Sequence, residues 1–111
     1  MLPHEFFKMM ADETRLRCLL LISRNERLCV LELVNALEES QPKISRHLAQ
    51  MRTMGVLKTA RQGQWVFYSV SEELPGWMKK VINGLRDSNC LREQYQTDIK
   101  RLSAMADRPC C

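Results

Sequence analysis

Five cysteine thiols are the side chains of this 111-residue sequence with the widest range of chemistry. A thiolate can bind a soft metal or metalloid, attack an electrophile, or be oxidised reversibly. The start, "MLPHEFFKMMADE", carries acids where a secretion signal needs a basic end and an apolar core. We therefore expect a cytosolic chain whose reduced thiols are packing residues, metal ligands or redox switches rather than partners in structural disulfide bonds. The five are Cys18, Cys29, Cys90, Cys110 and Cys111.

No catalytic pattern accompanies these thiols. The sequence has no Cys-x-x-Cys, no indicated Cys–His pair and no glycine-rich phosphate loop, so a thiol enzyme is disfavoured and no cofactor is expected. His4 and His47 are the only histidines, which is too few for a usual zinc site without several cysteines. The chemistry expected from this chain is therefore binding rather than turnover.

Positive charge is concentrated in the middle of the chain. The net charge is +4, yet no Asp or Glu occurs between Glu39 and Glu72, where five basic residues lie. The rest of the chain has 12 basic and 13 acidic residues, so this acid-free stretch supplies the whole positive excess. Such asymmetry indicates a nucleic-acid-binding module in preference to a solvated basic face. The five basic residues are Lys43, Arg46, Arg52, Lys58 and Arg61.

The segment "SQPKISRHLAQMRTMG" (40–55) predicts an amphipathic helix inside this stretch. Ser40 suits the N-cap, Pro42 the first turn, and Gly55 the left-handed position after the last turn. An apolar stripe forms one face, and basic and amide groups lie opposite or flank it, as on a recognition helix in a major groove. The predicted DNA-contacting residues are Gln41, Lys43, Ser45, Arg46, His47 and Gln50; for His47, at the edge of the stripe, domain packing is the alternative to a phosphate contact.

The segment "VLKTARQGQWVFYSV" (56–70) predicts a β-hairpin with a Gln-Gly turn. Lys58, Arg61 and Gln64 lie near its tip, where they suit contacts with the DNA backbone or minor groove. The aromatic residues of the second strand alternate as in a half-buried strand, which favours packing over base stacking.

The order of the predicted elements specifies a fold class. Helices are expected at 2–10, 12–25, 31–40 and 41–54, with a short strand at 27–30, the hairpin, and a helical region from Pro75 that is one long helix or two shorter ones. This order describes a winged helix-turn-helix: a mainly α fold with a β-hairpin wing, expected as a homodimer. We expect a single domain over 1–111, with the C-terminal helix and a cysteine-containing tail at about 75–111.

Three segments together resemble the ArsR family of metalloregulatory winged-helix repressors. They are "MADETRL", "SQPKISRHL" and "GVLKTARQGQWVFYSV", and the resemblance, closest to arsenical-resistance operon repressors, covers roughly residues 5 to 78. It implies a homodimer, joined through its first and last helices, on a palindromic DNA operator. It also implies that a bound metal or metalloid lowers DNA affinity and releases the promoter.

The sequence departs from that family at the arsenic site. Arsenite-sensing members carry Cys-Val-Cys-x-x-Cys before the recognition helix, whereas here only Cys29 remains and Leu31 and Val34 occupy the other positions. One thiolate cannot hold trivalent arsenic or antimony well. We therefore expect a relocated site in which adjacent Cys110 and Cys111, with Cys90, bind arsenite, antimonite or a trivalent organoarsenical. The alternative is a tail with incidental thiols.

Two other functions remain open in the same fold. One is a redox-sensing repressor, switched by oxidation of the C-terminal cysteines. The other is a constitutive DNA-binding module without an inducer.

Overall fold

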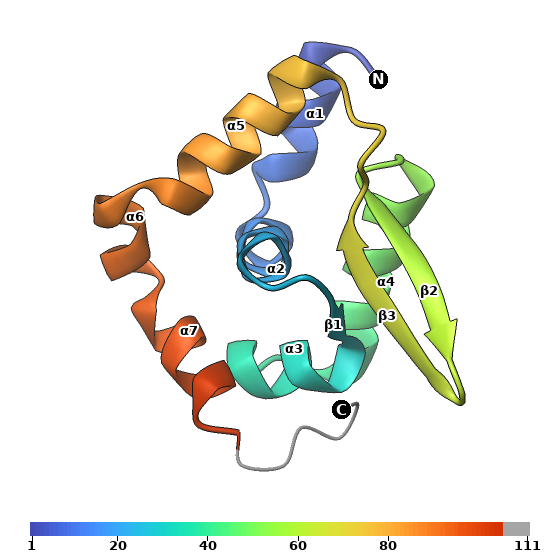
Figure 1. Cartoon of the computed structure of the whole chain (residues 1–111), viewed down its shortest axis with the longest axis vertical. Helices are drawn as coiled ribbons and strands as arrows, with labels where there is room; N and C mark the ends of the chain where they lie inside the picture. Colours follow the sequence, from blue (N-terminus) through green and yellow to red (C-terminus); the bar gives the residue numbers. More distant parts are fainter. Residues whose placement is uncertain (106–111) are drawn as a thin grey trace.

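The computed structural model describes residues 1–105 as seven helices and three short strands (Figure 1). The mainly helical fold with a β-hairpin wing confirms the predicted fold class. In chain order the elements are α1 (Pro3–Met10), α2 (Glu13–Arg24), β1 (Leu28–Cys29), α3 (Val30–Leu37), α4 (Gln41–Thr53), β2 (Leu57–Gln62), β3 (Trp65–Val70), α5 (Gly76–Asp87), α6 (Asn89–Gln94) and α7 (Gln96–Ser103). No helix among these 105 residues is long and apolar enough to cross a membrane.

Helix α2 forms the centre of the molecule, and Figure 1 looks almost along its axis with the other helices around it. The helix begins at Asp12, whose carboxylate accepts a hydrogen bond from the backbone N–H of Arg15 over 3.0 Å. Cys18, Leu19, Leu20, Leu21 and Ile22 are each at most 2% exposed, because α2 is surrounded on nearly every side. A helix with this run of buried side chains anchors the elements that form the functional surface.

The three strands form an antiparallel sheet in the order β1-β3-β2. Cys29 pairs with Phe67 across β1 and β3, and Gln62 pairs with Trp65 at the outer end of the hairpin. Gly63 closes the turn with φ +61°, a backbone conformation that glycine adopts without steric cost. Phe67 is 4% exposed, which confirms that this aromatic side chain of the wing packs in the domain.

Helix α4 begins and ends where its sequence predicts. The Ser40 hydroxyl accepts from the backbone N–H of Lys43 over 3.3 Å, and Pro42 lies in the first turn. The chain leaves the helix at Gly55, with φ +84°, and the backbone N–H of Val56 returns to the Met51 carbonyl oxygen over 3.0 Å. The helix is therefore fixed at both ends by local sequence.

Between Pro75 and Met105 the structure describes three helices, so the expectation of one or two helices from Pro75 was wrong. The chain turns at Ser88, whose hydroxyl caps α6 by accepting from the backbone N–H of Leu91 over 3.3 Å. It turns again at Tyr95, where φ is −108° and ψ is 18°. Capping by a serine side chain competes with helix continuation, which a search for Pro and Gly alone does not detect.

Helix α7 packs against α3, the first helix of the α3–α4 helix-turn-helix. The Arg17 guanidinium binds both carboxylate oxygens of Asp98, at 2.9 and 2.7 Å, and also donates to the Leu37 carbonyl oxygen over 3.1 Å. Arg101 donates to the Ala36 carbonyl oxygen over 3.2 Å. Glu38, with φ +54°, then turns the chain from α3 into the connection to α4. These contacts fix the end of α3, and with it the start of α4.

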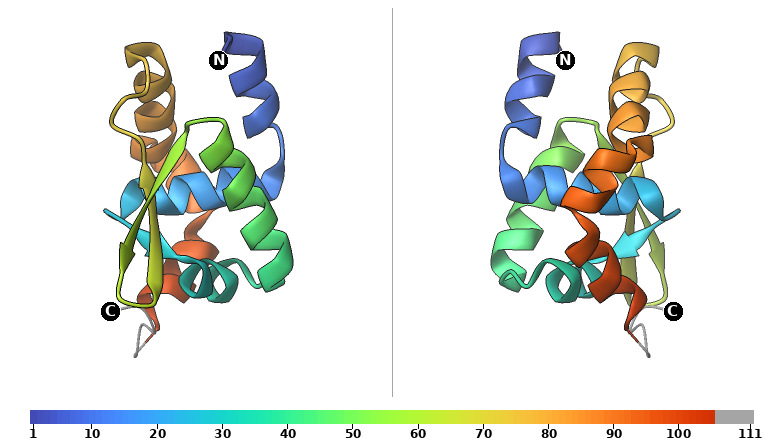
Figure 2. Two further views of the ribbon diagram at one scale, coloured as in Figure 1. Left: turned by 90° about the vertical axis from the view of Figure 1, so that its right-hand side faces the viewer. Right: turned by 90° about the vertical axis from the view of Figure 1, so that its left-hand side faces the viewer.

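Helices α1 and α5 stand side by side at one end of the molecule (Figure 2). Phe6 and Trp77 meet edge to face with ring centroids 5.3 Å apart, and Phe7 lies 6.3 Å from Trp77. Phe6 is fully buried, whereas Phe7 and Trp77 are 52% and 36% exposed. The pair of helices therefore presents an aromatic surface to solvent.

Candidate nucleic-acid interface

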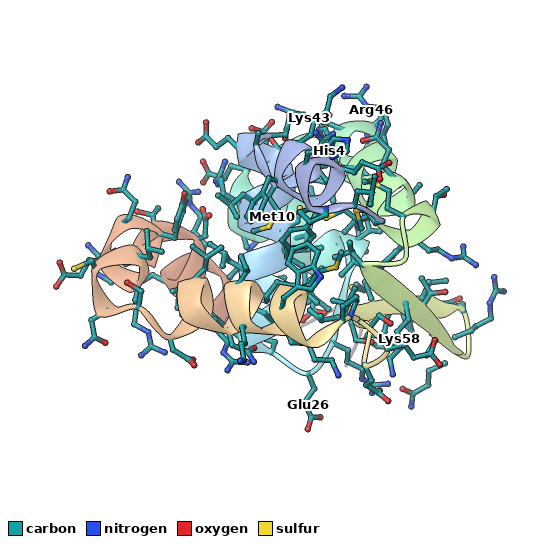
Figure 3. All side chains as sticks on the ribbon, turned by 90° about the horizontal axis from the view of Figure 1, so that it is seen from above. His4, Met10, Glu26, Lys43, Arg46 and Lys58 are labelled. Carbon is teal, nitrogen blue, oxygen red and sulfur yellow. The ribbon has the colours of Figure 1, made fainter. Side chains whose placement is uncertain are left out.

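Helix α4 separates its apolar and polar residues as predicted. Ile44, Leu48 and Met51 are fully buried, which holds one face against the domain. Arg46 and Gln50 are exposed on the opposite face, with Gln41 at the N-terminal end, and Lys43 and Ser45 are half-buried. Figure 3 shows Lys43 and Arg46 close together at one margin of the molecule. The side chains suited to duplex DNA therefore share one accessible surface.

His47 lies inside the domain, which corrects its place among the predicted DNA-contacting residues. It is 6% exposed, and its Nε2 lies 3.9 Å from a carboxylate oxygen of Asp12. Its Nδ1 is buried without a hydrogen-bond partner among the described residues. The position at the edge of the stripe turns inward, so the packing alternative describes His47 better than a phosphate contact.

Two of the five basic residues of the acid-free stretch form ion pairs with the acids that bound it. Lys43 Nζ lies 3.2 Å from Glu39, and Lys58 pairs with Glu72. The Lys58 hydrogen bond lowers the pKa of Glu72 below its ordinary value. Both pairs are on the surface, where such contacts stabilise a fold by only about 0–1 kcal/mol. DNA phosphates can therefore replace these carboxylates at little cost.

Arg61 and Gln64, in contrast, are exposed at the tip of the wing. Within residues 1–105, no ion pair engages Arg46, Arg52 or Arg61. Three guanidinium groups are thus available on α4 and the hairpin. Arginine is well suited to this role because its planar group donates two parallel hydrogen bonds to a phosphate or a guanine.

Comparisons with known proteins agree with this geometry. Residues 12–59 match the model of the family described as "Bacterial regulatory protein, arsR family". The chain is 50% identical to the arsenic resistance transcriptional regulator ArsR1 of Pseudomonas putida over 107 residues, covering 96% of this chain and 82% of that protein.

The chain belongs to the ArsR family.

Two further similarities support this membership. The arsenical resistance operon repressor of Escherichia coli is 45% identical over 103 residues, covering 93% of this chain and 86% of that protein. The structure of reduced HlyU from Vibrio cholerae superposes with a TM-score of 0.66 at 38% identity, covering 77% of this chain and 85% of that one. Members of the ArsR family are DNA-binding transcriptional regulators and not enzymes, so duplex DNA is the partner of this chain.

The ArsR-family chain places its described cysteines in three different environments. Cys90 is exposed on α6 and free. Cys18 is free and buried in α2, and burial raises the pKa of its thiol to about 12. Cys29 is 2% exposed between β1 and α3, packs with Phe67 and is disulfide-bonded. Among residues 1–105, no group of three or more His, Cys, Asp or Glu side chains is placed to hold a metal ion.

Only part of the predicted thiol site lies within the described residues. Cys110 and Cys111 lie outside the described residues, so of the three predicted ligands only Cys90 has a described position. Cys90 lies on the helix that leads into α7, and the exposed thiol is accessible to a ligand from solvent.

Sequence reasoning missed Arg15 as part of this surface. The Arg15 guanidinium donates from Nη1 to the side-chain oxygen of Gln50 over 3.1 Å, and from Nε to the Met9 carbonyl oxygen over 2.7 Å. One side chain thus connects α1, α2 and the recognition helix. Gln50 and Arg15 are 35 positions apart, and no periodicity of the sequence indicates their contact.

Proposed function

We propose that this chain represses an arsenical-resistance-type operon as a homodimer bound to a palindromic operator. A trivalent arsenic or antimony compound binds cysteine thiolates, lowers the affinity for the operator and releases the promoter. The observation that carries the proposal is the sequence identity of 45–50%, over almost the whole chain, to regulators named for arsenic resistance. The exposed cationic face of α4 supplies the corresponding DNA surface.

The aromatic surface of α1 and α5 supports the homodimer. Phe7 and Trp77 expose large rings beside each other, and Leu2, at the start of α1, is 60% exposed. Burying such a cluster against a second copy removes apolar area from water at about 25 cal/mol per Å². A two-fold assembly joined through this surface would present two copies of α4 to two halves of a palindrome.

The chemistry of the thiolates supports a soft inducer bound by Cys90, Cys110 and Cys111. Trivalent arsenic and antimony prefer sulfur ligands, and an organoarsenical has fewer open positions, so it needs only two. Cys90 is free and exposed, whereas Cys18 is buried and its raised pKa keeps it a thiol. Because inducer and DNA compete through one protein, the inducer must prefer the DNA-free form by the factor by which it weakens DNA binding.

The test is operator binding by the reduced protein, measured by fluorescence anisotropy on the DNA upstream of its own gene. Arsenite, antimonite and methylarsenite should each be titrated against the complex, with Zn(II) as a control. We expect release by at least one thiophilic compound, loss of release in Cys110→Ser and Cys111→Ser, and unchanged release in Cys18→Ser. Full release from a protein lacking both Cys110 and Cys111 would refute the ligand set, and absence of DNA binding would refute the whole proposal.

Redox sensing is the second candidate, and the disulfide-bonded state of Cys29 favours it. Cys29 is the N-cap residue of α3, which directly precedes the recognition helix, so oxidation there acts next to the DNA surface. If this candidate is correct, peroxide should change operator affinity in the absence of any metalloid. Dithiothreitol should restore the affinity, and Cys29→Ser should abolish the response.

A further inference from the structure

A groove of about 730 Å³ separates α1 from the exposed face of α4. Helix α1 contributes Lys8 and Met9 to its lining, α2 contributes Arg15, and α4 contributes Arg46 and Gln50. His4, from the first turn of α1, lines the same groove. The groove therefore continues the DNA surface of α4 towards the N-terminal helix.

Helix α1 has two different faces, and only one of them borders this groove. Phe6 and Phe7 lie on the aromatic side, against Trp77 of α5. Lys8 is exposed on the other side and lines the groove. Covering the aromatic side with a second copy would thus leave the basic side open.

The groove carries more positive than negative charge. Lys8, Arg15 and Arg46 contribute three cationic groups, and none of them forms an ion pair among the described residues. Glu5 is the one acid among the described residues of the lining, and its carboxylate accepts from the backbone N–H of Leu2 over 2.8 Å at the start of α1. Cationic groups on separate elements around one concave surface suit a ligand with repeated negative charges.

Arg15 sets the geometry of this groove. Its two hydrogen bonds, to the Met9 carbonyl oxygen and to Oε1 of Gln50, tie the end of α1 to the last turn of α4. Because Oε1 is occupied as an acceptor, the amide nitrogen of Gln50 is left to donate. A glutamine held in this way offers N–H groups to a phosphate oxygen or to an acceptor on a base.

We propose that this groove binds one strand of the DNA sugar-phosphate backbone beside the major groove that α4 enters. Lys8 and Arg46 contact phosphates, and Arg15 is a positioning residue that orients Gln50. The exposed apolar part of the lining, Ala49 and Met54, lies against deoxyribose. This inference rests on the DNA binding of the proposed function and extends the interface to α1, which neither the charge pattern nor the wing indicates.

The direct test is the salt dependence of operator affinity in Lys8→Ala and in a matched control, Lys100→Ala. Lys100 is exposed on α7 and does not line the groove. Each phosphate contact contributes about 0.9 to the slope of log affinity against log salt, so Lys8→Ala should lower the slope by about 1 and weaken binding several-fold at 0.1 M salt. Lys100→Ala should retain both the slope and the affinity of the wild-type chain.

A phosphate-neutralisation cycle locates the contact. A methylphosphonate placed at a single position of the operator removes the charge of one phosphate. At one such position the substitution should lower the affinity of the wild-type chain but have little further effect on the affinity of Lys8→Ala. Sedimentation of each variant must show an unchanged assembly, because α1 also carries the aromatic surface. Arg15→Lys keeps the charge but loses the two-way hydrogen bonding, so it should relax the preference for bases contacted by Gln50 more than it weakens total affinity.

The outcomes separate the two proposals. If Arg61→Ala, on the wing and outside the groove, weakens DNA binding while Lys8→Ala and Lys100→Ala both behave as wild type, the chain binds DNA but the groove does not, and the inference is overturned. If the wild-type chain ignores duplex DNA at low salt, the proposed function fails first. If Lys8→Ala lowered the affinity, relative to the wild-type chain, by the same factor on every methylphosphonate duplex, the loss would be a general charge effect. That result would also overturn the inference.

Discussion

The carboxylate of Asp98 on α7 is held by both the Nε and Nη2 atoms of Arg17 on α2, at 2.9 and 2.7 Å. Asp98 is 4% exposed, and the hydrogen bond to it is the main cause of the raised pKa of the Arg17 guanidinium. The same guanidinium reaches the Leu37 carbonyl oxygen at the end of α3. One buried ion pair thus joins the central helix, the C-terminal helix and the helix-turn-helix.

Removing one partner of this pair should destabilise the protein strongly. We expect Asp98→Ala to lower the free energy of unfolding by about 3 kcal/mol, because the guanidinium of Arg17, only 15% exposed, is then left without its carboxylate. The double variant Arg17→Met, Asp98→Leu should recover much of this loss. Urea denaturation monitored by circular dichroism measures both, and a double variant no more stable than Asp98→Ala would contradict this account.

The lowered pKa of Asp12, the N-cap residue of α2, predicts that the protein loses stability in acid. The backbone N–H of Arg15 is the main cause of its pKa lying below the ordinary value of 3.8. Because the pKa is lowered by folding, the stabilisation is present above about pH 4 and fades as the pH falls through the folded value. Asp12→Ala should cost about 1 kcal/mol at neutral pH.

The control for this prediction is Asp12→Asn, which retains an N-cap acceptor. It should be nearly as stable as wild type at pH 7 and should lose less stability between pH 5 and pH 3. Thermal unfolding across this range decides the point. Parallel acid profiles for the wild type and Asp12→Asn would mean that other groups dominate the transition.

The two free cysteines of the described part should differ greatly in reactivity. Cys90 is exposed, whereas the Cys18 thiol is buried and has a pKa raised to about 12, and only the thiolate is nucleophilic. In reduced native protein, iodoacetamide should label Cys90 within minutes and Cys18 only at the rate of unfolding. Peptide mass spectrometry resolves the two sites, and equal labelling of both in native buffer would be inconsistent with the structure.

Gly55 and Gly84 form a matched pair for testing the end of the recognition helix. Neither position has an atom within 4 Å of an added Cβ, but Gly55 has φ +84° and Gly84 lies within α5. Gly55→Ala should therefore cost about 1–2 kcal/mol through backbone strain alone. Gly84→Ala should be stabilising by about 0.5–1 kcal/mol. Chemical denaturation of both variants provides the comparison, and a neutral Gly55→Ala would mean that the helix ends differently in solution.

Local features of the sequence were sufficient to predict most of α4. Ser40, Pro42 and Gly55 specify its ends through capping and backbone preference, and the spacing of Ile44, Leu48 and Met51 specifies its buried face. These signals act within a few residues, so they do not depend on the rest of the fold. The hairpin was predictable for the same reason, from alternation around a glycine turn.

Features that depend on tertiary contacts were not predictable in this way. Helical periodicity places His47 at the edge of the apolar stripe of α4. Only the position of α2 decides that its side chain turns inward towards Asp12. The bonds of Arg15 to Gln50 and of Arg17 to Asp98 join residues 35 and 81 positions apart. Helical periodicity says which face is polar, but it does not say which partner that face will meet.

The central claim is that the exposed face of α4 binds duplex DNA, and the most direct measurement is operator affinity of Arg46→Ala against Arg92→Ala. Both arginines are exposed, but Arg92 lies on α6. By fluorescence anisotropy at 0.1 M salt, we expect Arg46→Ala to lose about 1–3 kcal/mol of binding free energy and Arg92→Ala to bind as wild type does. Equal affinity of Arg46→Ala and the wild-type chain would contradict the account.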